Sequence, residues 1–137
     1  MLRKDAKIEL IRKVPLFSQC SKRELASIAT LADLVDVPAD RKLVSEGARA
    51  REFMVIVSGS VDVRRANKRI ATLGSGDFFG EIALVAGGPR TASVITTAPT
   101  SVLVVTDGAF TSLLEGNPSL QIKVLKALAE RLRPAAV

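Results

Sequence analysis

The stretch from Phe78 to Val94 (FFGEIALVAGGPRTASV) constrains the fold of this chain more than any other, because unusual backbone and charge are concentrated in it. Gly80 allows the chain to bend with little steric penalty. Residues 81–85 have the composition of a helix of one or two turns, which is too short to be stable alone. Gly87-Gly88-Pro89 ends that helix, and residues 93–96 read as a strand. The stretch therefore predicts a turn, a short helix and a strand in close succession.

An arginine placed ten residues after Gly80 indicates what this turn and helix bind. The N-terminus of a helix presents unpaired N–H groups and partial positive charge, so phosphates bind there. Arg90 can fold back and add a planar, permanently charged fork to the same phosphate. The carboxylate of Glu81 would repel a phosphate, but it can accept a hydrogen bond from a neighbouring sugar hydroxyl, as acidic residues do in dinucleotide-binding folds. A phosphate and a ribose hydroxyl together indicate a nucleotide.

The whole stretch resembles the phosphate-binding cassette of cyclic nucleotide-binding domains, the family of the bacterial catabolite activator, the regulatory subunits of protein kinase A and the cyclic-nucleotide-gated channels. The matching residues are Phe79-Gly80-Glu81-Ile82-Ala83-Leu84 and then Pro89-Arg90-Thr91-Ala92. The resemblance implies that Arg90 pairs with the cyclic phosphate and that Glu81 accepts a hydrogen bond from the ribose 2′-hydroxyl. It implies further ligand contacts, including backbone N–H groups, from Phe79, Gly80, Ile82, Ala83, Leu84, Thr91 and Ala92. The alternative is a glycine-rich corner of a β-barrel with an incidental surface arginine.

Patterns outside this stretch predict helices at both ends of the chain and short strands between them. Residues 4–14 are expected to form an amphipathic helix, and Ser21 with Glu24 forms a capping box that begins a second helix. Alternating or apolar runs separated by turns then follow at 34–37, 42–45, 53–57, 61–64, 69–73, 93–97 and 101–106. Short strands at a spacing of roughly 8–12 residues indicate an antiparallel barrel or jelly roll. Helices are expected again over 107–116 and from Asn117, the predicted N-cap.

These patterns predict a mainly β fold with flanking helices in a single domain of 137 residues. An N-terminal helical segment (1–33) precedes an antiparallel, jelly-roll-like β-roll (34–106). The roll contains the cassette (78–94) with its short helix, and two C-terminal helices (107–133) follow. This order of elements is also the architecture of the resembled family, and the resemblance covers about residues 8–133.

The composition excludes several kinds of chemistry. The chain has no histidine and one cysteine, Cys20, so a tetrahedral zinc site, catalysis by cysteine with histidine and an internal disulfide are excluded. There is no P-loop, and no run approaches the roughly 20 apolar residues of a membrane span. We therefore expect no enzyme activity, no metal, no cofactor beyond a bound cAMP or cGMP, and a cytoplasmic location.

The net charge of +6 invites a nucleic-acid hypothesis, but the distribution of the charge weakens it. The basic residues come as scattered pairs, and the chain has no tyrosine or tryptophan to stack on bases. DNA-binding regulators of the catabolite-activator type also need a helix-turn-helix after the long helix. We therefore expect no sequence-specific DNA binding by this chain alone. A sensor fragment of such a regulator stays an alternative.

The expected function is that of a non-catalytic regulatory module that binds a cyclic nucleotide. We favour cAMP over cGMP because the apolar positions Val55, Val57 and Leu73 offer no further group that would recognise a particular purine. Thr91 does not decide between the two nucleotides. In the resembled family the C-terminal helix moves over the base as a lid, which makes Leu125 and Leu128 the lid candidates. The alternative is a β-roll interaction module that has lost its ligand. The last helix could then contact a second copy, as a homodimer, or an effector protein.

Overall fold

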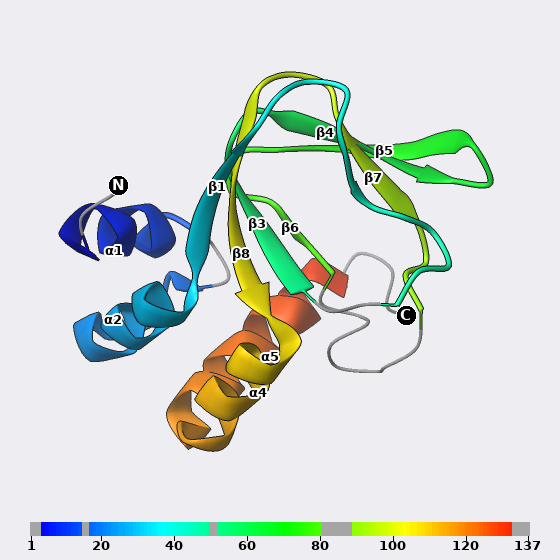
Figure 1. The fold of residues 1–137 in the computed structure, drawn as a ribbon. Helices are drawn as coiled ribbons and strands as arrows, with labels where there is room; N and C mark the ends of the chain where they lie inside the picture. The colour runs from blue at the N-terminus through cyan, green and yellow to red at the C-terminus, as the bar shows by residue number, and fades with distance from the viewer. Residues whose placement is uncertain (1–3, 15–16, 50–51, 81–88, 133–137) are drawn as a thin grey trace. The chain divides into compact units, whose positions relative to one another are not determined.

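The computed structural model describes residues 4–14, 17–49, 52–80 and 89–132. Contacts divide the chain into two compact units, one of residues 33–107 and the other of residues 1–32 together with 108–137. The first unit is built of strands and the second of helices (Figure 1). The ends predicted for the β-roll, at 34 and 106, lie next to the boundaries of the first unit.

The strand unit is an antiparallel β-roll, as predicted. Its strands are β1 (Asp33–Val37), β2 (Lys42–Val44), β3 (Glu52–Ser58), β4 (Ser60–Arg65), β5 (Lys68–Gly74), β6 (Phe78–Phe79), β7 (Ser93–Thr96) and β8 (Thr100–Thr106). They form two four-stranded sheets with the orders β1-β8-β3-β6 and β2-β7-β4-β5, and the paired strands run antiparallel (Figure 1). The sequence patterns did not predict β6, because two residues are too few to show an alternation.

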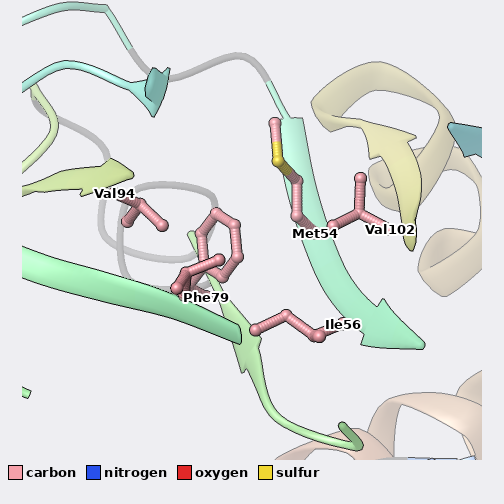
Figure 2. Close-up of a cluster of buried hydrophobic side chains, with 6 residues drawn as sticks. Met54, Ile56, Phe79, Val94 and Val102 are labelled. Carbon is pink, nitrogen blue, oxygen red and sulfur yellow. The ribbon is translucent and has the colours of Figure 1, made fainter. Parts of the chain in front are cut away.

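Apolar side chains from both sheets fill the interior of the roll. Successive side chains of a strand point to opposite faces, so Met54 and Ile56 of β3 point inward together. They form a buried cluster with the side chains of Val61, Phe79, Val94 and Val102 (Figure 2). Leu73 packs against this cluster, whereas Val55 is buried outside it on the other face of β3. Of the positions expected around the purine, Leu73 therefore adjoins the roll interior and Val55 does not.

The helical unit consists of four described helices, α1 (Lys4–Arg12), α2 (Lys22–Leu31), α4 (Asp107–Glu115) and α5 (Pro118–Leu132). The capping box at the start of α2 is confirmed, because the Ser21 N–H donates to Glu24 Oε1 at 2.7 Å and the Glu24 N–H donates to Ser21 Oγ at 3.2 Å. Asn117 precedes α5 as predicted, but its side-chain amide donates to the Leu113 carbonyl of α4 at 2.7 Å. The cassette helix predicted at 81–85 lies outside the described residues.

Charged side chains connect the helices of this unit. Lys7 of α1 donates to the Ala29 and Ala32 carbonyls, at 3.0 and 2.7 Å, at the C-terminal end of α2. Lys123 of α5 forms an ion pair with Glu24 of α2 at 2.6 Å. A lysine is well placed at the end of a helix, because the last carbonyls have no partner within the helix and carry partial negative charge.

Candidate functional site

Arg90 is held by its backbone and its side chain is turned into the protein. Its N–H donates to the Ala48 carbonyl at 2.8 Å, and its carbonyl accepts from the Gly47 N–H at 2.9 Å. An isolated bridge between Arg49 and Pro89 continues the same pairing. These contacts tie the residue to a segment far from it in sequence. Arg90 is only 7% exposed, which is unusual for a side chain that carries a permanent charge.

The guanidinium of Arg90 lies against the first residue of β3. Its Nη2 donates to the Glu52 carbonyl oxygen at 2.5 Å. Removing a guanidinium from water is costly, and a neutral carbonyl does not cancel its charge. This bond therefore orients the guanidinium.

Gly80 makes room for the guanidinium. Its φ is +94°, a backbone conformation that favours glycine. A Cβ atom at this position would lie 2.5 Å from Arg90 Nη1 and 2.8 Å from the Glu52 carbonyl oxygen. Gly80 directly follows β6, whose pairing with β3 brings it beside Glu52. We call Gly80, Arg90 and the Glu52 carbonyl the arginine seat.

Of the other predicted site residues, the structure describes Phe79, Thr91 and Ala92. Phe79 lies in the interior cluster of the roll, where its ring packs among Met54, Ile56 and Val94 (Figure 2). Thr91 is exposed and Ala92 is half-buried, and both directly follow Arg90. The remaining predicted site residues, Glu81, Ile82, Ala83 and Leu84, lie outside the described residues. The structure thus brings Gly80 and Arg90 into contact.

A cavity adjoins the arginine seat through Glu52. Its volume is about 470 Å³, and the side chains that line it are those of Arg49, Glu52, Val104, Thr106 and Asp107. Small-molecule sites fall in the range of roughly 300–1,000 Å³. The cavity is therefore large enough for a nucleotide-sized molecule, although Arg90 is not among the residues that line it.

Sequence reasoning missed two contributors to this site. The Glu52 carbonyl carries no signal in the sequence, because any residue at that point of β3 would offer the same oxygen. Arg65 was not singled out, because with Arg64 it is one of the scattered basic pairs, yet its Nε donates to the Thr91 carbonyl at 3.0 Å. A side chain that reaches across 26 residues becomes visible only when the pairing of β4 with β7 is known.

Cys20 lies in the helical unit and is half-buried. Burial raises the pKa of its thiol to about 11, and the negative charge of Glu24 adds to the shift. The thiol is therefore protonated at neutral pH and is a poor nucleophile, because the thiolate is the reactive form.

The described part of the chain has no candidate metal site and no candidate membrane span. No group of three or more cysteine, aspartate and glutamate side chains there could hold a metal ion. None of the described helices is both long enough and apolar enough to cross a membrane.

Comparison with known proteins connects this geometry to a family. Residues 34–117 match the model of the cyclic nucleotide-binding domain. The Pycsar effector protein PaPycTIR of Pseudomonas aeruginosa is 35% identical over 90% of this chain and 39% of its own length. The cAMP-dependent protein kinase regulatory subunit of Mycosarcoma maydis is 33% identical over 77% of this chain and 22% of its own length. The chain therefore spans well under half of these relatives.

A solved structure supports the same fold. The regulatory domain of Toxoplasma gondii PKA, crystallised with cAMP, superimposes with a TM-score of 0.81 at 21% identity, over 93% of this chain and 50% of that one. At that identity the likeness concerns the fold. The family match begins at the second residue of β1 and includes the other strands and the arginine seat. The chain belongs to the cyclic nucleotide-binding domain family.

Proposed function

We propose that this chain is a non-catalytic sensor that binds a cyclic nucleotide through an ion pair between Arg90 and the cyclic phosphate. The observation that carries the proposal is the arginine seat. A buried guanidinium is held in place by a carbonyl and by a glycine with positive φ. A fixed, desolvated fork suits a phosphate, because it offers two parallel hydrogen bonds without a cost of reorganisation.

The remaining contacts follow from the cassette. Glu81 accepts a hydrogen bond from the ribose 2′-hydroxyl, and the backbone N–H groups near Ile82, Ala83 and Ala92 complete the phosphate site. Thr91 is exposed, so its hydroxyl is available to the phosphate or to a guanine. We favour cAMP over cGMP, and we place the sensor in the cytoplasm.

Titration calorimetry with cAMP and cGMP on wild type and on Arg90→Ala tests the proposal. Arg90→Ala should weaken binding by at least about tenfold, because a hydrogen bond to a charged group is worth about 1.5–3 kcal/mol. Arg90→Lys should recover only part of the loss, since lysine lacks the fork. Arg69→Ala, which removes an exposed arginine of β5, is the matched control and should bind like wild type. Unchanged affinity in Arg90→Ala would refute the site.

A 2′-deoxy analogue in the same titration isolates the role of Glu81. Wild type should bind the analogue clearly less well than cAMP, whereas Glu81→Ala should discriminate little between the two. Equal affinity of wild type for both nucleotides would remove this role from Glu81.

The second candidate is an interaction module that works through α5. Ile122 and Leu125 of this helix are 61% and 67% exposed, and a helix with exposed apolar side chains is available to a ligand, a second copy or an effector. In the sensor proposal Leu125, or Leu128, whose side chain lies outside the described residues, covers the purine. Hydrogen exchange over 118–132 separates the candidates. Protection that rises with cAMP favours the sensor, and protection that rises only with protein concentration favours the interaction module.

A further inference from the structure

The hairpin of β4 and β5 is fastened to the segment that follows Arg90. The Arg65 Nε at the end of β4 donates to the Thr91 carbonyl at 3.0 Å. Among the described residues, no carboxylate lies within ion-pair distance of Arg65. Its guanidinium therefore acts here as a hydrogen-bond donor to the backbone.

Glu46 makes a second connection between the same two segments. Its N–H donates to Ser93 Oγ at 2.9 Å, and its Oε1 accepts from the Ala66 N–H at 3.0 Å. Ala66 and Asn67 form the turn of the hairpin. Their φ angles are 51° and 66°, values that residues other than glycine adopt rarely. The Glu46 carboxylate holds this turn in place, so the end of the hairpin that carries Arg65 has a defined position.

The bond from Arg65 also determines the direction of the next N–H group. The C=O of Thr91 and the N–H of Ala92 belong to one planar trans peptide and point in opposite directions. Because the Thr91 carbonyl points to the hairpin, the Ala92 N–H points away from it. The Ala92 N–H donates to no acceptor in the described ranges.

We propose that Arg65 is a positioning residue, which holds the Thr91–Ala92 peptide so that the Ala92 N–H is aimed at the phosphate of the bound nucleotide. This inference rests on the proposed function. Arg90 supplies the charge and Arg65 supplies the orientation of the adjacent backbone donor. Arg65 itself does not touch the ligand.

Two substitutions separate the donor from the charge. The amide nitrogen of glutamine stands the same number of bonds from Cα as the arginine Nε, so Arg65→Gln keeps a donor and removes the charge. Arg65→Met has a similar length and removes both. Lys68 lies opposite Arg65 in the hairpin register, so Lys68→Met removes a charge from the same hairpin without touching Thr91.

The experiment measures cAMP affinity by calorimetry for wild type and the three variants. Arg65→Met should bind about three- to tenfold more weakly, the change in a binding constant that one hydrogen bond is worth. Arg65→Gln and Lys68→Met should bind within about twofold of wild type, since a distant exposed charge contributes little at physiological salt. Equal losses in Arg65→Met, Arg65→Gln and Lys68→Met would mean that charge alone acts, and unchanged affinity in Arg65→Met would also overturn the proposal.

A second measurement reports on the peptide without ligand. The ¹⁵N–¹H resonance of Ala92 should shift in Arg65→Met and stay close to wild type in Arg65→Gln, while the rest of the spectrum confirms the fold. An unshifted Ala92 resonance in Arg65→Met would refute the positioning role. Failure of wild type to bind either cyclic nucleotide would instead refute the phosphate site, and the role of Arg65 toward a ligand with it.

Discussion

The β-roll and the helical unit differ in the kind of polar bond that joins the segments within each of them. In the roll, several contacts between distant segments end on short, buried hydroxyls such as those of Thr96 and Thr100. The charged side chains of Glu46, Arg65 and Arg90 also join distant segments there, and their partners are backbone groups. In the helical unit such contacts end on long charged side chains, those of Lys7, Glu24 and Lys123. A short hydroxyl loses little conformational freedom when it is fixed, whereas a lysine loses much.

This difference has consequences for the arginine seat. Every residue of the seat belongs to the roll, where backbone pairing places Gly80 beside Glu52. Polar bonds to backbone respond weakly to salt and pH, while ion pairs near the surface respond to both. We therefore expect mutations in the roll to lower the free energy of unfolding more than mutations of Lys7, Glu24 or Lys123. We also expect the stability that depends on pH to come from these charged side chains.

Gly59→Ala in the roll should have the largest effect. Gly59 has a φ of +102°, and an added Cβ would contact Thr100 Oγ1 and lie 2.6 Å from the Pro99 carbonyl oxygen. The left-handed conformation costs an alanine about 1–2 kcal/mol. Overpacking against backbone adds about 1–3 kcal/mol. Urea denaturation should show the free energy of unfolding reduced by about 2–5 kcal/mol.

Gly47 provides the matched control for this prediction. Its φ is +82°, but an added Cβ would meet nothing within 4 Å. Gly47→Ala should therefore carry only the conformational cost of about 1–2 kcal/mol. Equal losses in the two variants would show that the tight approach at Gly59 does not contribute.

Thr96→Val should have an intermediate effect on the free energy of unfolding. Thr96 is fully buried, and its hydroxyl donates to the Pro38 carbonyl at 2.7 Å and accepts from the Arg41 N–H at 2.8 Å. Valine fills the same volume but leaves both backbone groups without this partner, at a cost of about 1–3 kcal/mol.

Thr72→Val tests whether burial causes the loss. Thr72 is exposed, and its hydroxyl makes a single longer bond, of 3.3 Å, to Asp62 Oδ1. Its substitution should change the free energy of unfolding by no more than about 0.5 kcal/mol. A loss at Thr72 as large as that at Thr96 would contradict the contrast between buried and exposed hydroxyls.

Sequence patterns predicted those parts of the molecule that depend on local chemistry. The β3 and β8 runs, the Ser21–Glu24 capping box and the start of α5 at Pro118 all follow from residue types within a few positions. The cassette residues were proposed from the sequence because their charges and spacing can be recognised there.

The rest depends on which strands pair, and local patterns do not contain that information. Gly80 lies beside the Glu52 carbonyl because β6 pairs with β3, and β6 is too short to be seen in the sequence. Arg90 reaches the same carbonyl because its backbone is bonded to Gly47 and Ala48. The same holds for Arg65, whose partner is a backbone oxygen rather than a side chain. Which face of β3 carries Val55 likewise depends on the pairing of the strands, because successive side chains point to opposite faces.

The ion pair of Glu24 and Lys123 should give the smallest effect, and the one that depends on pH. The Lys123 ammonium, which donates to Glu24 at 2.6 Å, lowers the pKa of this carboxyl below its ordinary 4.5, and the Ser21 N–H adds to the shift. A lowered pKa in the folded state stabilises the protein at pH values above 4.5, and the contribution is lost as pH falls through the lowered pKa. Near neutral pH, urea denaturation should therefore show that Glu24→Gln lowers the free energy of unfolding by about 1 kcal/mol or less.

Glu24→Gln removes the negative charge without removing the capping box, because glutamine can accept the same hydrogen bond at this position. The difference in the free energy of unfolding between wild type and Glu24→Gln should shrink as pH falls below 4.5, because the Glu24 carboxylate of wild type then becomes protonated and loses its charge. The substitution should also lower the pKa of Cys20, since the Glu24 charge helps to raise it, and should speed alkylation of that thiol at alkaline pH. Lys123→Met removes the same ion pair and should instead raise the Cys20 pKa and slow alkylation, because the ammonium lowers it. A stability difference that stays constant across the acid range, or alkylation that changes in the same direction in both variants, would mean that the charges do not act as this geometry requires.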